Sequence, residues 1–113
     1  MSKANELTTA ILDHLYRNGA FGWRSESAGV FDQRLGLYRT SPKRGVSDIL
    51  AMLPPNGRLL ACEVKVGKDR LSPEQTGFLA NIKHYGGLTF VAKDFESFKE
   101  WFKHILDEQK MVS

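Results

Sequence analysis

The spacing of hydrophobic residues predicts three helices. Residues 5–18 carry apolar side chains at every third or fourth position, which is the repeat of a helix with one buried face. A second helix is expected to begin after Ser72, because Ser72 and Gln75 have the spacing of a capping box with a proline between them. Asp94 can cap a third helix. The apolar stripe of this third helix consists of Phe95, Phe98, Trp101, Phe102 and Ile105.

Two strands joined by a turn are predicted in the middle of the chain. The segments 46–53 and 58–66 are rich in apolar residues, and a Pro-Pro-Asn-Gly sequence separates them. Asn-Gly is a strong hairpin signal, and the prolines should end the pairing because they lack an amide hydrogen. A shorter strand is expected at 88–92, whereas 20–45 mixes strand-like stretches with turn formers. This order of elements predicts an α/β sandwich with a mixed sheet.

Composition limits the class of protein. The chain has 113 residues, enough for one domain, and its formal net charge is +3. That charge is compatible with nucleic acid binding without establishing it. A lone cysteine allows no internal disulfide, the histidines lack zinc-ligand spacing, and neither a membrane span nor a signal peptide is visible. We therefore expect a single domain over residues 1–113, located in the cytoplasm, with no membrane attachment and no small-molecule cofactor.

Alternation along the segment 58–66 separates an apolar face from a charged face. The even-numbered side chains from position 60 onward are apolar and predict the core, whereas Glu63 and Lys65 project from the other face. A two-residue turn places Asp48 opposite Lys65, and a register shifted by two residues places it opposite Glu63. Either register gathers the three side chains within about 8 Å. A shift by one residue would put the two apolar faces on opposite sides of the sheet.

Two carboxylates beside one ammonium group suit a hard divalent cation. Asp48 and Glu63 would repel each other, and Lys65 offsets only part of that repulsion. Carboxylate oxygens, a backbone carbonyl such as that of Val64, and waters are the ligands that Mg²⁺ prefers, and Mn²⁺ can substitute. A bound cation activates water and stabilises charge on a phosphate, and Lys65 would assist both. A surface ion pair between Asp48 and Lys65 is the alternative, but it leaves Glu63 unexplained.

This motif resembles that of the PD-(D/E)XK nuclease superfamily. The matching residues are Gly45-Val46-Ser47-Asp48, Glu63-Val64-Lys65, Ser72 and Gln75. Within the superfamily, the chain most resembles the stand-alone VRR-NUC domains, from about Glu6 to Val91. The resemblance implies a restriction-endonuclease-like α-β-β-β-α-β core with a mixed central sheet flanked by helices. The sequence departs from the pattern at Ser47, where the superfamily nominally has proline, and no Val-Arg-Arg sequence is visible.

The resemblance also implies a function. It implies an endonuclease that hydrolyses DNA phosphodiester bonds with Mg²⁺ or Mn²⁺, acting as a homodimer on branched or four-way-junction DNA in repair or recombination. The catalytic or metal-binding residues that the resemblance implies are Asp48, Glu63, Val64 through its carbonyl, Lys65 and Gln75. Glu6 resembles a helix carboxylate that many members add to the metal site, although a first-turn glutamate is also favoured by the helix dipole. Gln75 has a second interpretation as the capping partner of Ser72.

Basic residues on both sides of the motif are candidates for DNA contacts. They are Arg39, Lys43 and Arg44 before Asp48, and Lys68 and Arg70 after Lys65. Such contacts position DNA without reading its sequence, and a solvated loop is the alternative for each of them. Two other functions stay open for the whole chain. One is a DNA-binding module of the same fold without chemistry, and the other is a restriction-type nuclease acting on short duplex sites.

Overall fold

The helices and strands expected from the sequence are present in the computed structural model, which describes residues 2–25, 30–39 and 45–112. Ser72 and Gln75 form the predicted capping box, and Asp94 accepts a 2.7 Å hydrogen bond from the Ser97 amide at the start of the last helix. In chain order the elements are α1 (Lys3–Arg17), β1 (Phe21–Arg24), β2 (Val30–Asp32), β3 (Leu37–Arg39), β4 (Ile49–Leu53), β5 (Arg58–Val64), α2 (Pro73–His84), β6 (Leu88–Ala92) and α3 (Phe95–Val112).

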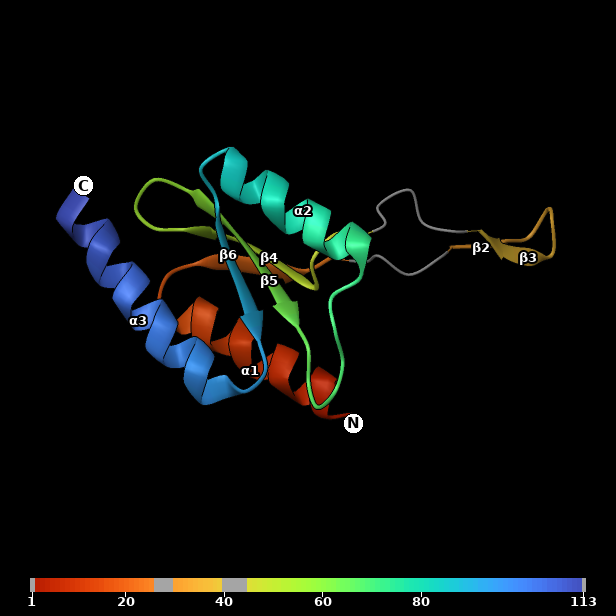
Figure 1. The fold of residues 1–113 in the computed structure, drawn as a ribbon, viewed down its shortest axis with the longest axis horizontal. Helices are drawn as coiled ribbons and strands as arrows, with labels where there is room; N and C mark the ends of the chain where they lie inside the picture. The colour runs from red at the N-terminus through yellow and green to blue at the C-terminus, as the bar shows by residue number, and fades with distance from the viewer. Residues whose placement is uncertain (1, 26–29, 40–44, 113) are drawn as a thin grey trace.

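A four-stranded mixed sheet forms the centre of the fold (Figure 1). Its strand order is β1-β4-β5-β6, in which β5 and β6 are parallel and the other neighbours are antiparallel. The strands β2 and β3 form a separate hairpin, inserted between β1 and β4, that lies apart from the sheet. Without this insertion the order is α1, β1, β4, β5, α2, β6, so the expected α-β-β-β-α-β core is confirmed.

Helices cover both faces of the sheet. The helices α1 and α3 pack together on one face, and α2 lies on the other face over β5 and β6 (Figure 1). The largest side chains of the core between α1, α3 and the sheet have no exposed surface, and full burial of each contributes about 1.5–3 kcal/mol. They are Ile11, Leu15, Ile49, Leu60, Phe98 and Phe102. In the described part of the chain, no helix has the length and apolar character needed to cross a membrane.

The register of β4 and β5 follows the longer turn. Leu53 pairs with Arg58 across the Pro-Pro-Asn-Gly sequence, so the register that a two-residue Asn-Gly turn would give is wrong. The prolines account for this difference, because neither can donate a hydrogen bond to extend the ladder. Continuing the observed register by one residue beyond β4 places Asp48 opposite Glu63 rather than Lys65.

Candidate active site

Glu63 is the next-to-last residue of β5, and its side chain is fully buried, with an exposed fraction of 0%. Its Oε1 accepts a hydrogen bond of 3.2 Å from Gln75 Nε2, whereas its Oε2 is buried without a hydrogen-bond partner among the described residues. Burial and then the neighbouring Asp48 raise the pKa of Glu63 to about 8, and Lys65 opposes this shift. The Glu63 carboxyl group in this position is therefore favourable when it is protonated, and its ionised form requires a compensating cation.

Asp48 directly precedes β4, where the sheet ends. Its Oδ2 accepts a 2.8 Å hydrogen bond from the Val64 amide, and its main-chain oxygen accepts a 2.9 Å bond from the Ser25 amide. These bonds fix the carboxylate between β1 and β5. The N–H and C=O groups of a strand residue point to the same side, so the Val64 carbonyl also faces the side on which Asp48 lies.

Lys65 directly follows β5 and is only 8% exposed. Its amide donates a 2.9 Å hydrogen bond to the Ala92 carbonyl, which continues the pairing with β6. Its Nζ lies 3.7 Å from Asp69 Oδ2. Among the described residues, the ion-pair partner of Lys65 is thus Asp69, so the simple surface pair between Lys65 and Asp48 is not what the structure contains.

A cavity of about 260 Å³ opens beside these residues. Because a water molecule occupies about 30 Å³ in the liquid, the cavity has room for several waters or for a phosphate group. Glu63 is not among the residues that line it. The lining residues are Asp48, Val64 and Lys65, together with Ala4, Asn5 and Thr8 from α1, Arg24 and Ser25 at the end of β1, and Asp69.

The donor groups fit one divalent cation. The carboxylates of Asp48 and Glu63 are neighbours, and the Oε2 of Glu63 is a buried acceptor without a described partner. Among the residues described, no group of three or more His, Cys, Asp or Glu side chains could hold a metal ion. A cation here would therefore complete its coordination with the Val64 carbonyl and waters, which suits Mg²⁺ because it keeps much of its hydration shell.

Gln75 contacts both the helix terminus and the buried carboxylate. Its Oε1 accepts a 2.8 Å hydrogen bond from the Ser72 main-chain amide. The Gln75 main-chain amide donates a 3.1 Å bond to Ser72 Oγ. Its Nε2 is the group that donates to Glu63. Because the two contacts use different atoms of one side chain, capping and contact with Glu63 coexist, and a role of Gln75 in catalysis stays a prediction.

Glu6 does not join this group. It is exposed and lines a different hollow, formed by α1, the segment after β5 and the start of α3. The α1 residues that face the Asp48 cavity are Ala4, Asn5 and Thr8. Successive helix residues are turned by about 100°, so a neighbour in sequence can face another side. The structure therefore does not bring Glu6 to the cavity beside Asp48, and a part for Glu6 in a metal site stays a prediction.

The described residues among those expected to bind DNA lie in two different segments. Lys43 and Arg44 lie outside the described residues, and Arg39 ends β3 in the separate hairpin. Lys68 and Arg70 are exposed in the segment between β5 and α2. Their contact with DNA stays a prediction.

Three residues that line the cavity were not expected from the sequence to lie at this site: Arg24, Asn5 and Thr8. These residues reach the cavity because β1 pairs with β4 and α1 packs over both strands. The short alternation in β1, with Phe21 and Trp23 on one face and Arg24 on the other, was the only signal, and by itself it says nothing about which site Arg24 faces.

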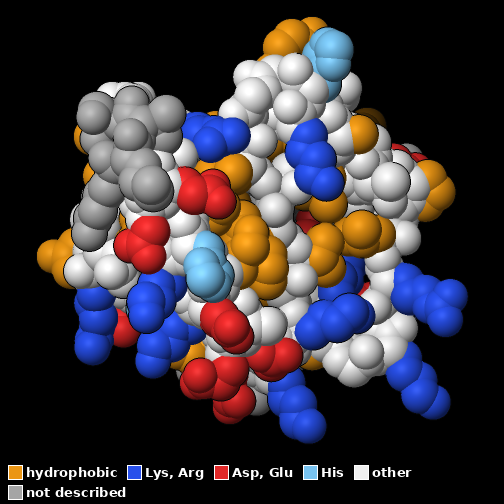
Figure 2. Space-filling view, turned by 60° about the vertical axis from the view of Figure 1, so that its left-hand side comes forward, with side chains coloured by type: hydrophobic (Ala, Val, Ile, Leu, Met, Phe, Trp, Pro, Cys, Tyr) orange, Lys and Arg blue, Asp and Glu red, His pale blue; other side chains and the backbone are white. Residues whose placement is uncertain are grey.

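The side of the molecule that carries α3 has charges of both signs. Figure 2 turns this side forward and shows Lys and Arg side chains on its flanks, with Asp and Glu side chains between them and an apolar strip nearby. A surface that attracts a DNA backbone would instead concentrate positive charge.

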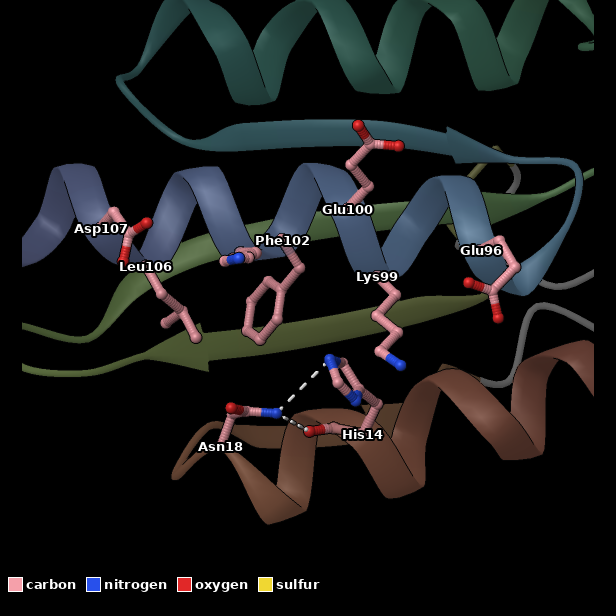
Figure 3. Close-up of a pocket in the computed structure, with 9 residues that line it drawn as sticks. His14, Asn18, Glu96, Lys99, Glu100, Phe102, Leu106 and Asp107 are labelled. Atoms are coloured by element: carbon pink, nitrogen blue, oxygen red, sulfur yellow. Dashed lines mark hydrogen bonds between the residues drawn. The ribbon is translucent and has the colours of Figure 1, made fainter.

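A larger hollow of about 500 Å³ lies between α1 and α3 (Figure 3). The Phe102 and Leu106 side chains contribute apolar surface to it, and lysines and carboxylates surround them. The His14 ring meets the edges or faces of Phe95, Phe98 and Phe102 at centroid distances of 5.5, 6.3 and 5.9 Å. The predicted site residues are absent from its lining, and we interpret this hollow as a seam of helix packing.

Comparisons with known proteins identify the family. The sequence model of the VRR-NUC domain matches residues 9–95, a range that includes Asp48, Glu63 and Lys65. A solved structure described as a VRR_NUC domain aligns with a TM-score of 0.69 at 19% identity, covering 92% of this chain and 98% of that chain, and so has the same fold. A search of curated proteins found no match. The chain therefore belongs to the VRR-NUC domain family.

Proposed function

We propose that this single domain is a metal-dependent endodeoxyribonuclease that hydrolyses phosphodiester bonds in the cavity beside Asp48 and Lys65. Membership of the VRR-NUC family makes it a nuclease-like domain that acts on DNA. The observation that carries the proposal is the buried carboxylate of Glu63 next to Asp48. Two negative charges in this position are unfavourable alone, and Mg²⁺ or Mn²⁺ would compensate them.

Each site residue has a separate task in this mechanism. A cation held by Asp48, Glu63 and the Val64 carbonyl would supply Lewis acidity toward water and the phosphate. The Val64 amide fixes the orientation of the Asp48 carboxylate. Gln75 holds Oε1 of Glu63 and leaves Oε2 for the cation. The ammonium group of Lys65 lines the cavity, where it orients the attacking water and stabilises negative charge in the transition state.

The proposal includes a homodimer that cleaves branched DNA in repair or recombination. Phe21 and Met52 lie opposite each other in neighbouring strands and are 68% and 47% exposed. They are on the same sheet face as α2, in the part over β1 and β4 that α2 does not cover. The Trp23 ring lies 5.4 Å from that of Phe21 on the same face. Clustered exposed apolar side chains support an interface with a second copy. A twofold dimer would present two cavities to two strands of a junction.

The test is a cleavage panel of single strands, duplexes, flaps and four-way junctions with Mg²⁺, Mn²⁺ or a chelator. Wild-type protein should cleave only with metal. Lys65→Ala should lose about 10²–10³-fold in rate with an unchanged circular dichroism spectrum, because one transition-state contact is removed. Lys103→Ala, an exposed change on α3, is the matched control.

The outcomes separate the parts of the proposal. Full activity in Lys65→Ala would exclude the mechanism. Salt-dependent DNA binding without cleavage in either metal would identify a non-catalytic binding module instead. Preference for a short duplex sequence would favour the restriction-type nuclease. A monomeric mass in sedimentation analysis, with and without junction DNA, would exclude the dimer and leave the chemistry untouched.

A further inference from the structure

We infer that Arg24 is a further substrate-binding residue of this site and holds a backbone phosphate of the DNA strand at the cavity. This inference rests on the proposed nuclease function. Arg24 is the last residue of β1 and lies outside the motif of Asp48, Glu63 and Lys65. It lines the same cavity as Asp48 and Lys65.

The arginine side chain is held in place by α1. Arg24 pairs with Ile49 in the β1–β4 register, which directs both side chains to the face that α1 covers. Its guanidinium donates to Thr9 Oγ1 at 3.1 Å and to Asn5 Oδ1 and the Asn5 main-chain oxygen at 3.4 and 3.5 Å. An arginine that is oriented before the ligand arrives loses less conformational entropy on binding.

The acceptors that hold Arg24 are uncharged. All three described acceptors are amide, main-chain or hydroxyl oxygens, so they orient the guanidinium without neutralising it. These bonds use three of the five N–H donors that a guanidinium has. They occupy both Nη2 hydrogens and one Nη1 hydrogen, so Nε–H and the other Nη1 hydrogen stay available as single donors. Charge-assisted hydrogen bonds from an un-neutralised guanidinium suit an anionic oxygen ligand, which makes a phosphodiester the ligand class for this arrangement.

The charges around the cavity leave a need for a positive group besides Lys65 to attract the DNA backbone, and Arg24 supplies one. Asp48 and Asp69 both line the cavity and would repel a DNA backbone, and Asp69 is already the ion-pair partner of Lys65 at 3.7 Å. Arg24 reaches the cavity from β1, whereas Lys65 and Asp69 reach it from the segment after β5. A strand crossing the cavity would therefore meet the metal and Lys65 at the scissile phosphate and Arg24 at the phosphate beside it.

A purely structural role of Arg24, joining β1 to α1, makes different predictions. Loss of that link would lower the temperature of unfolding and leave DNA binding by the folded protein unchanged. A phosphate contact instead contributes to the salt dependence of binding, because each neutralised phosphate releases counterions. The slope of log affinity against log salt concentration separates the two roles.

The experiment compares Arg24→Gln, Arg24→Lys and wild-type protein. Arg17→Gln is the matched control, because Arg17 is an exposed arginine of α1 that already pairs with Asp13 at 2.9 Å. Binding of a labelled duplex and a labelled four-way junction is measured with chelator at several salt concentrations, and cleavage is measured with Mg²⁺. Arg24→Gln should weaken binding about tenfold for both DNAs and reduce the salt slope by about 0.9. Arg24→Lys should keep the slope and recover part of the affinity, and Arg17→Gln should match wild type.

Wild-type affinity and slope in Arg24→Gln would overturn the inference, even where wild-type protein cleaves DNA. Binding without cleavage by wild-type protein would contradict the proposed function, and the binding comparison would still decide the role of Arg24. Thr9→Val tests the same inference if Arg24→Gln does not fold, because it removes one orienting acceptor and keeps the charge. This variant should bind about two- to threefold more weakly with an unchanged salt slope, and wild-type affinity in both Thr9→Val and Arg24→Lys would overturn the inference.

Discussion

Replacing Glu63 with glutamine should change how the stability of the metal-free protein depends on pH. Burial and Asp48 raise the pKa of Glu63 from its ordinary value of 4.5 to about 8 in the folded protein. The folded state therefore holds this proton more tightly than the unfolded state does. The resulting stabilisation is complete below about pH 4.5 and is lost as the pH rises toward 8. Glutamine does not titrate and so removes this dependence.

The structure sets the size of the effect. One pKa unit corresponds to about 1.36 kcal/mol, so the full shift would cost the wild-type protein about 3 kcal/mol of unfolding free energy between pH 4.5 and pH 7. Relaxation around a buried charge reduces such penalties, and we expect a difference of about 1–3 kcal/mol. This is a large share of the roughly 5–15 kcal/mol that stabilises a typical domain.

Urea unfolding at pH 5, 6, 7 and 8 with chelator measures the difference. Glu63→Gln should equal wild type near pH 5 and exceed it at pH 7 and 8. Burial lowers the pKa of His14, and its titration also changes stability in this range, but it does so in both proteins and cancels in the comparison. Glu100→Gln, an exposed change on α3, is the control and should follow wild type. If the unfolding free energies of wild type and Glu63→Gln changed with pH in parallel, the argument that ionisation of the buried Glu63 destabilises the fold would be refuted.

Other predictions concern the cation, α2 and the approach to β4. Mg²⁺ or Mn²⁺ should raise the unfolding temperature of wild-type protein more at pH 8 than at pH 6, since the cation displaces a proton, and should not stabilise Glu63→Gln; equal shifts at both pH values in scanning fluorimetry would contradict this. Ser72→Ala should cost about 1 kcal/mol of stability through loss of the cap, whereas Gln75→Ala should also slow cleavage; equal cleavage rates in the two variants would restrict Gln75 to capping. Gly45→Ala should cost at least about 1–3 kcal/mol in urea unfolding, because Gly45 has a φ of +84° and an added Cβ would lie 2.5 Å from the Glu74 main-chain oxygen; an unchanged midpoint would contradict this.

Local periodicity was sufficient to predict the centre of the site. Side chains alternate along a strand whatever the tertiary structure, so the apolar even positions of β5 fixed the face from which Glu63 projects. The same pattern restricted the register to shifts of two residues, and these all bring Asp48 to that face. The depth of burial of Glu63 was not predictable, since it results from α2 packing over β5, which no local pattern encodes.

The positions of Glu6 and Arg24 depend on tertiary packing. The apolar stripe of α1 shows which side of the helix is buried, but not which flank of that stripe lies beside β4. Asn5 and Thr8 occupy that flank, and Glu6 lies on another side. Arg24 reaches the cavity through the pairing of β1 with β4, and a β2–β3 hairpin of the chain separates these strands in sequence. Sequence distance and the short length of β1 hide both relationships.

The buried carboxylate links the stability of this domain to its proposed chemistry. A protonated Glu63 is neutral and needs no metal, whereas an ionised Glu63 beside Asp48 is unfavourable in the metal-free fold. In the proposed mechanism, a bound cation would return the free energy that ionisation removes, and cation affinity would therefore rise with pH. Glu63→Gln removes both effects at once, so the variant should be the more stable metal-free protein and the inactive one. A variant that gained stability at pH 8 and still cleaved DNA at the wild-type rate would separate the two properties and locate the metal elsewhere.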